Sequence, residues 1–251
     1  MGRKVHPIGY RLGHTTRWES TWYADRDYTA LLLEDIEIRK LVRKYLEAPG
    51  GRDSRRGGGG GRRRGSFGAG VSRIEIERNV SQARVVIHTA RPGIVIGRGG
   101  SNREEIQRRI QKQTGKRVVV DVREIDQPEL DAFLVARNVA DQLERRVSFR
   151  RAIKMTAERT IRAGAEGVKI MVSGRLGGRE MSRTEFELLG TVPLQTLDAN
   201  IDYGLTEART TAGRIGVKAW VHRGNVREQA ELLSEQVSRP SPAGRRTGAR
   251  T

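Results

Sequence analysis

A glycine-rich loop between two helical patterns constrains the fold of this chain more than any other stretch of its sequence. The loop, residues 97–100 (G-R-G-G), follows the short apolar run 94–96 and directly precedes a helical pattern over residues 101–114. Glycine adopts backbone angles that other residues avoid, and it lets another molecule approach the main chain closely. Because the N-terminus of a helix favours anions, we expect the loop to hold a phosphate group, with Arg98 adding a positive charge.

The pattern after the loop has the features of a helix with defined ends. Ser101 and Glu104 have the spacing of a capping box. Ile106 and Ile110 recur at helical spacing and mark a buried face, and Gly115 is a typical helix terminator. The helix is therefore expected to begin directly after the glycine loop.

Elements on either side of the loop complete a small α+β unit. The helical spacing of leucine, isoleucine and valine predicts a helix over 29–46. Apolar residues at every second position predict strands at 73–77, 84–87 and 118–122. The predicted order is helix, strand, strand, short helix, glycine loop, helix, strand.

This element order, together with the pattern Ile96-Gly97-x-x-Gly100, resembles the K-homology (KH) domain of type II. The resemblance implies a three-stranded sheet with helices over residues 29–125, and a GxxG loop that clamps about four nucleotides of single-stranded RNA or DNA. The residues that it implies in RNA binding are Ile96, Gly97, Arg98, Gly99 and Gly100.

The net charge indicates a polyanionic partner. The chain has 48 Lys and Arg against 30 Asp and Glu, a net charge of +18, and cations that neutralise phosphates release counterions and strengthen binding to nucleic acid. No run approaches about 18 apolar residues and no basic amphipathic terminal helix is visible, so we expect no membrane partner. The absence of cysteine fits a reducing compartment. The start lacks a signal-peptide core, so the protein is expected to work where it is made.

Motifs of catalytic or cofactor-binding sites are not recognisable in the sequence. Neither the loop at 97–100 nor a second glycine loop at 174–178 is followed by the Lys-Ser/Thr of a phosphate-binding P-loop. A dinucleotide fingerprint would need a third glycine where Asn102 stands. The four histidines lack the spacing of metal ligands, and no carboxylate cluster or activated nucleophile is visible. We therefore predict no enzyme, no catalytic residue, no metal, no cofactor and no small-molecule substrate.

A second α+β unit is expected over residues 126–224, with two helices on a mostly antiparallel sheet. Periodic apolar residues predict its helices at 133–147 and 148–163. Alternating patterns predict its strands near residues 168–172, 186, 199–210 and 215–222.

Closely spaced basic residues surround the start of the second of these helices. They are Arg145, Arg146, Arg150, Arg151 and Lys154. A solvated helix surface is one interpretation. Few acidic residues lie nearby in the sequence, and the mutual repulsion of like charges favours the other interpretation, a binding face for a polyanion.

Two segments flank the two predicted domains, and a third interrupts the first domain. Residues 1–28 are predicted to form a basic N-terminal arm. Residues 48–70 contain ten glycines and six arginines against one aspartate, and they are predicted to be a disordered insertion, either a tether that follows nucleic-acid backbones or a passive linker. Residues 225–251 are expected to begin as a short polar helix and to continue as a disordered basic tail.

Segments along nearly all of residues 2–224 resemble the bacterial-type small-subunit ribosomal protein S-three family. They are G-R-K-V-H-P-I-G-Y-R-L-G at 2–13, S-T-W-Y-A at 20–24, H-T-A-R-P-G-I-V-I-G at 88–97, Q-L-E-R-R-V-S-F-R-R-A-I-K at 142–154, S-G-R-L-G-G at 173–178 and I-G-V-K-A-W-V at 215–221. The resemblance implies a structural, RNA-binding protein in the head of the small ribosomal subunit. It implies a cytoplasmic location in a bacterium, with an organelle ribosome as the alternative.

The resemblance also implies partners and further site residues. The partners are small-subunit rRNA, mRNA at its entrance tunnel, and ribosomal proteins S-ten and S-fourteen, which pack against the N-terminal half. The holding and unwinding of incoming mRNA falls to Arg150, Arg151 and Lys154. The candidates for rRNA binding are Arg3, Lys4, His6, Arg11, Arg175 and Arg179.

The sequence departs from the family pattern at the insertion 48–70 and at three positions near residue 195. Thr191, Gln195 and Asp198 stand where the family usually has Arg, His and Arg. Asp198 replaces a positive charge with a negative one, which bears on the contacts of this segment with rRNA or neighbouring proteins. A free-standing KH regulator of RNA is the alternative function, although it would not need the arm or the second unit.

Overall fold

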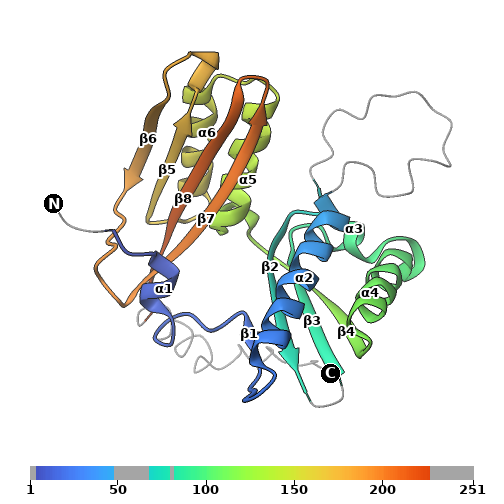
Figure 1. The fold of residues 1–251 in the computed structure, drawn as a ribbon. Helices are drawn as coiled ribbons and strands as arrows, with labels where there is room; N and C mark the ends of the chain where they lie inside the picture. Colours follow the sequence, from blue (N-terminus) through green and yellow to red (C-terminus); the bar gives the residue numbers. More distant parts are fainter. Residues whose placement is uncertain (1–3, 48–67, 80–81, 227–251) are drawn as a thin grey trace, which may run out of the picture.

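The computed structural model describes residues 4–47, 68–79 and 82–226, which form two sheet-based units (Figure 1). The predictions for Arg3, for most of the insertion and for the C-terminal tail lie outside the described residues. The last three residues of the predicted insertion, 68–70, are described and ordered. Ala69 is buried, and its carbonyl accepts a hydrogen bond from the Thr89 hydroxyl at 2.5 Å, so the expectation of disorder is wrong for these three.

The first unit is a four-stranded sheet covered on one face by helices. Its elements are β1 (Ser20–Thr21), α2 (Tyr28–Glu47), β2 (Val71–Arg78), β3 (Gln82–Thr89), α3 (Pro92–Ile96), a 3₁₀ turn (Arg98–Gly100), α4 (Ser101–Thr114) and β4 (Arg117–Glu124). The sheet order is β1-β2-β3-β4, in which the central pair is antiparallel and the two outer pairs are parallel. The predicted helices and strands are present in the predicted order.

Strand alternation and helix periodicity place the core of the first unit between sheet and helices. The residues that share this core include Ile74, Ile76, Val85, Ile87, Val118 and Val120 of the strands, and Ile38, Val42, Ile106 and Ile110 of the helices. Burial of each such side chain contributes about 1.5–3 kcal/mol to stability. Among the apolar residues of α2, Ile38 is buried, whereas Leu32, Leu33 and Ile36 remain partly exposed.

The fourth strand of this sheet comes from the N-terminal arm. β1 pairs in parallel with β2, with Ser20 opposite Ile76. The fully buried Asp35 of α2 fixes this strand, because one of its carboxylate oxygens accepts hydrogen bonds from Ser20 Oγ and Trp22 Nε1, both at 2.8 Å. Arg78 of β2 donates to the other oxygen at 2.5 and 2.8 Å. The three-stranded sheet of the prediction thus gains a short edge strand.

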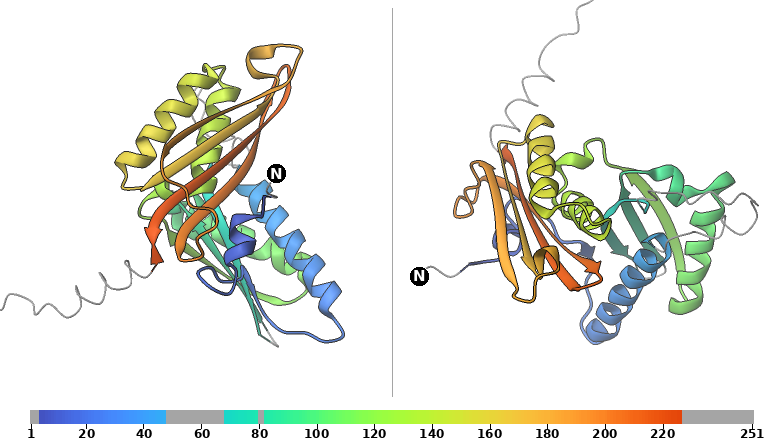
Figure 2. Two further views of the ribbon diagram at one scale, coloured as in Figure 1. Left: turned by 90° about the vertical axis from the view of Figure 1, so that its left-hand side faces the viewer. Right: turned by 90° about the horizontal axis from the view of Figure 1, so that it is seen from above.

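The second unit is an antiparallel sheet with two helices on one face. Its elements are a 3₁₀ turn (Pro128–Leu130), α5 (Ala132–Glu144), α6 (Phe149–Arg162), β5 (Gly167–Gly174), a second 3₁₀ turn (Leu176–Gly178), β6 (Arg183–Gly190), β7 (Ala199–Thr210) and β8 (Gly213–Asn225). The sheet order is β6-β5-β8-β7. Helices α5 and α6 cover one face, and the short helix α1 (Pro7–Arg11) lies on the opposite side (Figure 2).

The capping box predicted for α4 is not present. Ser101 is the first residue inside the helix, and the N-cap is Gly100, which makes no side-chain capping hydrogen bond. Gly100, with a left-handed φ of +86°, takes the N-cap position that the capping box assigned to Ser101. The other end agrees with the prediction, because Gly115 closes α4 with φ +67°.

Two acids, the buried Asp131 and the half-buried Asp202, join the end of the first unit to the second. Asp131 caps α5 by accepting the Leu134 amide at 3.0 Å, and it accepts a hydrogen bond from Ser72 of β2. Asp202 of β7 accepts the Ala132 amide at 3.0 Å and the Arg223 guanidinium at 2.7 Å. Burial raises the pKa of Asp202 above its ordinary value, and the nearby Arg223 opposes that rise. The two sheets are therefore connected through hydrogen bonds of the Asp131 and Asp202 carboxylates.

Arg223→Met is expected to lower the free energy of unfolding by about 2 kcal/mol at neutral pH, because it removes a hydrogen bond to a charged group. Without Arg223 the pKa of Asp202 rises further. The Asp202 carboxyl then keeps its proton to a higher pH in the native state than in the unfolded state, where its pKa is near 3.8. Ionisation of this carboxyl therefore destabilises the fold increasingly as pH rises. The difference between parent and variant, measured by urea unfolding, should shrink at acid pH. A difference in unfolding free energy that is constant with pH would show that the pKa of Asp202 does not depend on Arg223.

Candidate nucleic-acid interface

The glycine loop has backbone angles that favour glycine over other residues, as its sequence predicts. Gly97, Gly99 and Gly100 have φ angles of +73°, +60° and +86°, a region that side chains with a Cβ rarely adopt. The loop joins α3 to α4, so the main chain of residues 97–100 lies at the start of a helix of 14 residues. Partial positive charge gathers there and favours an anion.

The three glycines have different steric surroundings. A Cβ at Gly97 would lie 2.7 Å from Cγ of Asn102, whose amide donates to the Ile94 carbonyl at 3.0 Å and so ties α4 back to α3. A Cβ at Gly99 or Gly100 would meet no heavy atom within 4 Å. Gly97 thus serves the internal packing of the loop, whereas Gly99 and Gly100 leave open space in which a sugar-phosphate backbone can approach.

Exposed apolar and basic side chains border the loop. Ile94 and Ile96 of α3 are 44% and 39% exposed, and Arg98 projects from the loop itself as an exposed side chain. Isoleucines beside a loop that is predicted to bind phosphate offer a surface on which bases can pack. The sequence analysis named Ile96 as a candidate for RNA binding, but not Ile94 or Asn102. The run Ile94-Val95-Ile96 indicated a short helix, and in the structure only its middle residue, Val95, is buried.

The basic residues at the start of α6 share an exposed surface. All five predicted members of this basic cluster are exposed: Arg145, Arg146, Arg150, Arg151 and Lys154. Arg146 lies in the connection between α5 and α6. Its φ of +62° is the only positive φ of a non-glycine residue in the described part of the chain. Within the same part, Arg146, Arg150, Arg151 and Lys154 form no ion pair with a carboxylate. Their charges are therefore available to an external polyanion.

Aromatic contacts hold part of the basic cluster in place. The Arg150 guanidinium lies 5.8 Å from the centre of the Phe149 ring, and Arg183 of β6 lies 5.1 Å from the same ring. Arg183, on the edge strand of the sheet, also pairs with Glu185 at 3.7 Å, so it lies beside the basic cluster with its charge partly compensated. Sequence reasoning missed this residue, because it is 33 positions away from Arg150 along the chain and nothing local connects them.

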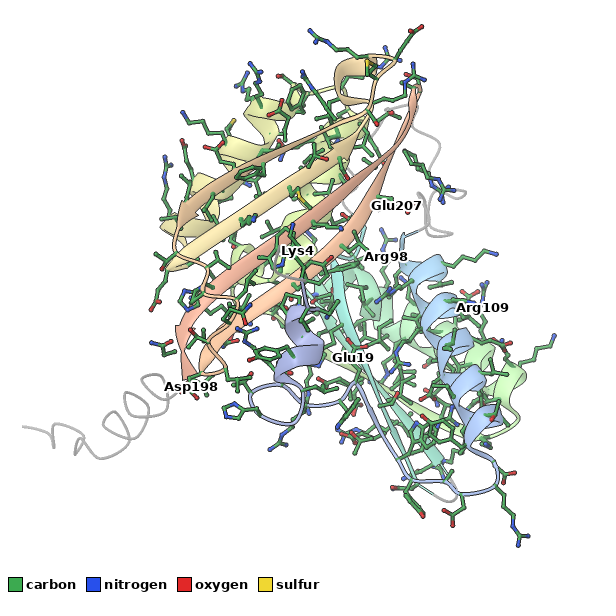
Figure 3. The ribbon with its side chains drawn as sticks, turned by 60° about the vertical axis from the view of Figure 1, so that its left-hand side comes forward. Lys4, Glu19, Arg98, Arg109, Asp198 and Glu207 are labelled. Carbon is green, nitrogen blue, oxygen red and sulfur yellow. The ribbon has the colours of Figure 1, made fainter. Side chains whose placement is uncertain are left out.

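The candidates for rRNA binding differ in their surroundings. Lys4 is exposed, and Figure 3 shows it on the side of the second sheet that lacks α5 and α6. His6 caps α1 by accepting the Gly9 amide at 3.3 Å, and its ring packs edge-on against Tyr203 at 4.8 Å. Arg175 donates to the carbonyls of Arg179 and Ala212 at 2.9 and 3.2 Å. These contacts leave Arg175 and Arg179 exposed, so they stay candidates.

Arg11 does not fit the predicted RNA contact, because its side chain is completely buried. Its guanidinium donates to five main-chain carbonyls, at distances between 2.6 and 3.3 Å. The acceptors are Pro7, Pro193, Leu194, Thr196 and Ala199. Burial lowers the pKa of Arg11 below its ordinary value. Arg11 is thus a structural residue that fastens α1 to the segment before β7.

The segment that departs from the family pattern is the one that Arg11 holds. The Thr191 carbonyl lies 3.1 Å from His222 Nδ1, and the Gln195 carbonyl accepts the Tyr10 hydroxyl at 3.4 Å. Asp198 lies 4.0 Å from His14, and Figure 3 shows it at the same end of the second sheet as α1. The three positions therefore lie in contact with α1, its following turn and β8.

Two other kinds of site are absent from residues 4–47, 68–79 and 82–226. In these ranges, no group of three or more histidine, aspartate or glutamate side chains is placed to hold a metal ion. None of the helices in the same ranges is long and apolar enough to cross a membrane.

Comparison with known proteins gives matches along most of the chain. Residues 66–130 match the family model described as KH domain, and residues 139–221 match the model described as ribosomal protein S3, C-terminal domain. The chain is 48% identical over 240 residues to small ribosomal subunit protein uS3 of Syntrophomonas wolfei, an alignment that covers 96% of this chain and 94% of the relative. It is 51% identical over 226 residues to uS3 of Brevibacillus brevis, with 90% and 94% covered. The identity with uS3 of Caldicellulosiruptor bescii is 49% over 238 residues, with 94% and 98% covered.

Proposed function

Because the chain belongs to the family of small ribosomal subunit protein uS3, we propose that it is a structural component of the small ribosomal subunit that binds rRNA and lines the mRNA entrance. Family membership and the α+β fold with a KH domain confirm the sequence-based predictions. Proteins of this family are structural and are not enzymes. The observation that carries the proposal is the pair of exposed basic sites, the glycine loop on the first unit and the basic cluster on the second.

The first part of the proposal, rRNA binding by the glycine loop, rests on its geometry. Two of its glycines, Gly99 and Gly100, face open space, Arg98 is exposed beside them, and α4 begins at the loop. These features suit a sugar-phosphate backbone at close approach.

Protein partners are proposed for the N-terminal half. Large apolar side chains are exposed there, namely Trp18 at 68%, Tyr23 at 86%, Tyr28 at 53% and Leu33 at 57%. An exposed group of this size is typical of a protein interface. We assign this surface to ribosomal proteins S-ten and S-fourteen, the neighbours that the family resemblance implies.

A free-standing KH regulator is the second candidate function, favoured only by the glycine loop. Sedimentation separates the two candidates. In cells that express the tagged chain, the protein should travel with the small-subunit peak at low magnesium and with whole ribosomes at high magnesium. A protein that stays at the top of the gradient in both conditions would contradict the ribosomal assignment.

The second part of the proposal, contact with incoming mRNA, is tested by replacing Arg150, Arg151 and Lys154 together with Ala. The fold should be retained, because alanine favours helix and the change relieves like-charge repulsion on α6. Reconstituted ribosomes should translate messages with a stable hairpin just downstream more slowly, while unstructured messages pass almost normally. The contact is with phosphates, so base sequence should not matter.

The control for this experiment removes the same charge elsewhere. Lys40 and Lys44 of α2 and Lys112 of α4 are exposed, and their joint replacement with Ala should leave both kinds of message unaffected. If the triple variant on α6 translates structured and unstructured messages as the control does, the basic cluster is a solvated helix surface without a role at the mRNA entrance.

A further inference from the structure

A groove of about 1080 Å³ runs between the two units. Arg43 of α2 and Arg91, just before α3, line it from the first unit, while residues of α5, α6 and β7 line it from the second. Figure 1 and the view from above in Figure 2 show α5 on the side of the second unit that faces the first. This volume lies just above the range of about 300–1,000 Å³ that is typical of small-ligand pockets. An extended occupant therefore fits the groove better than a small ligand does.

Positive charge lines both walls of the groove. The arginines are Arg43, Arg91, Arg137, Arg145, Arg159 and Arg209, and the carboxylates are Glu129, Asp141, Glu144 and Glu207. Two of the four carboxylates already have cationic partners, since Asp141 pairs with Arg137 at 3.0 Å and Glu207 with Arg214, outside the groove, at 3.0 Å.

Three of the arginines have no carboxylate partner among the described residues. Arg159 of α6 and Arg209 of β7 are exposed, and neither side chain makes an ion pair or hydrogen bond within the described ranges. Arg43 packs its guanidinium 5.4 Å from the centre of the Phe133 ring, an arrangement that leaves the charge itself uncompensated. Because Arg43 comes from one unit and Arg159 and Arg209 from the other, an anion in the groove would be bound from both sides.

The groove also offers a hydroxyl and an apolar wall. Thr206 lines it with only 8% of its surface exposed, and its hydroxyl has no hydrogen-bond partner in the part of the chain that the structure describes. Such a group costs stability unless something pairs with it. Phe133, Leu134 and Val71 line the same space. Arginines, a free hydroxyl and an aromatic ring together match the phosphates and bases of a single strand.

Two residues that line the groove adjoin the two sites of the proposed function. Arg91 directly precedes α3, which leads into the glycine loop, and Arg145 belongs to the basic cluster at the start of α6. We infer that the groove is an RNA-binding channel, in which one single strand runs from the glycine loop to the basic cluster with its phosphates on Arg43, Arg159 and Arg209. This inference rests on the proposed RNA binding at the loop and adds a third site that joins the other two.

The test compares short and long RNA on the full chain. Oligouridylates of about 4 nucleotides occupy a KH loop alone, whereas those of about 16 nucleotides can extend along a channel. For Arg159→Ala with Arg209→Ala, affinity for the short RNA should equal that of the parent. Affinity for the long RNA should fall about tenfold or more, and the slope of log affinity against log salt should flatten by about 1.4, since each single-strand phosphate contact contributes about 0.7.

The matched control is Lys112→Ala with Arg117→Ala, two exposed cations at the far end of α4 that do not line the groove. It should retain the affinity and the salt slope of the parent on long RNA. If the groove variant behaves as this control does, the groove does not bind RNA. In that case, an acidic peptide that binds the parent but not the groove variant would assign the groove to a protein partner. Loss of short-RNA binding in a glycine-loop variant tests the proposed function separately, so the two failures are distinguishable.

Discussion

Arg11→Met is expected to lower the free energy of unfolding by about 3–5 kcal/mol. The substitution removes a buried guanidinium that donates to five carbonyls, and each hydrogen bond to a charged group contributes about 1.5–3 kcal/mol. Water that reaches the carbonyls left behind offsets part of the loss. Urea unfolding followed by fluorescence measures the change, and hydrogen exchange should show that the amides of residues 193–199 lose protection first.

Two further variants define this result. Arg11→Lys keeps the charge but has three donors on a point charge in place of a planar fork, so it should recover only part of the lost stability. Arg17→Met makes the same replacement at an exposed arginine of the same segment, where a change within about 0.5 kcal/mol is expected. If Arg11→Met is as stable as Arg17→Met, the buried guanidinium does not hold α1 to the sheet.

Replacement of Arg98 and Gly99 with Asp is expected to weaken the binding of short single-stranded RNA by at least tenfold. The two aspartates repel phosphate at the point where the open loop faces solvent. The fold should persist, because a side chain at Gly99 meets nothing within 4 Å, and aspartate is among the residues that tolerate its φ of +60°. Filter binding at fixed salt measures the effect on the full chain.

The structure provides a closely matched control for this variant. Gly115, at the other end of α4, has φ +67° and equally open surroundings, and Arg117 beside it is exposed. Their joint replacement with Asp changes the net charge by the same amount and imposes the same backbone requirement. Equal affinity of the two double variants would mean that the loop is not an RNA clamp and that only net charge matters.

Local pattern was sufficient for most elements because their determinants are close together in the sequence. Alternating residues such as Ile74 and Ile76 have one face to bury whatever the rest of the chain does. The helix over 101–114 was predicted with its observed bounds, since its buried isoleucines lie within it and the terminal Gly115 directly follows it. The conformation of the loop was also readable, because glycine at 97, 99 and 100 removes the steric barrier to positive φ, whereas its binding of phosphate stays a prediction.

The capping box shows where local pattern is insufficient. Ser101 and Glu104 have the correct spacing, yet Gly100 takes the N-cap position and Ser101 is the first residue inside the helix. The exposure of Leu33 has a similar origin. Helical spacing predicts that α2 is a helix, but only tertiary packing decides that Ile38, Val42 and Leu46 are buried and that Leu33 is exposed.

The sequence alone determined the two α+β units, their element order, the family resemblance and the positions of the exposed basic residues, because each of these depends on residues near one another in the chain. Tertiary structure alone decided that Arg11 is buried among carbonyls up to 188 positions away, that β1 joins the first sheet, and that Arg43 faces Arg159 and Arg209 across a groove. An arginine has the same letter whether it meets solvent, a phosphate or five carbonyls. Its environment is set by which distant segments pack around it, and a linear pattern carries no direct record of that packing.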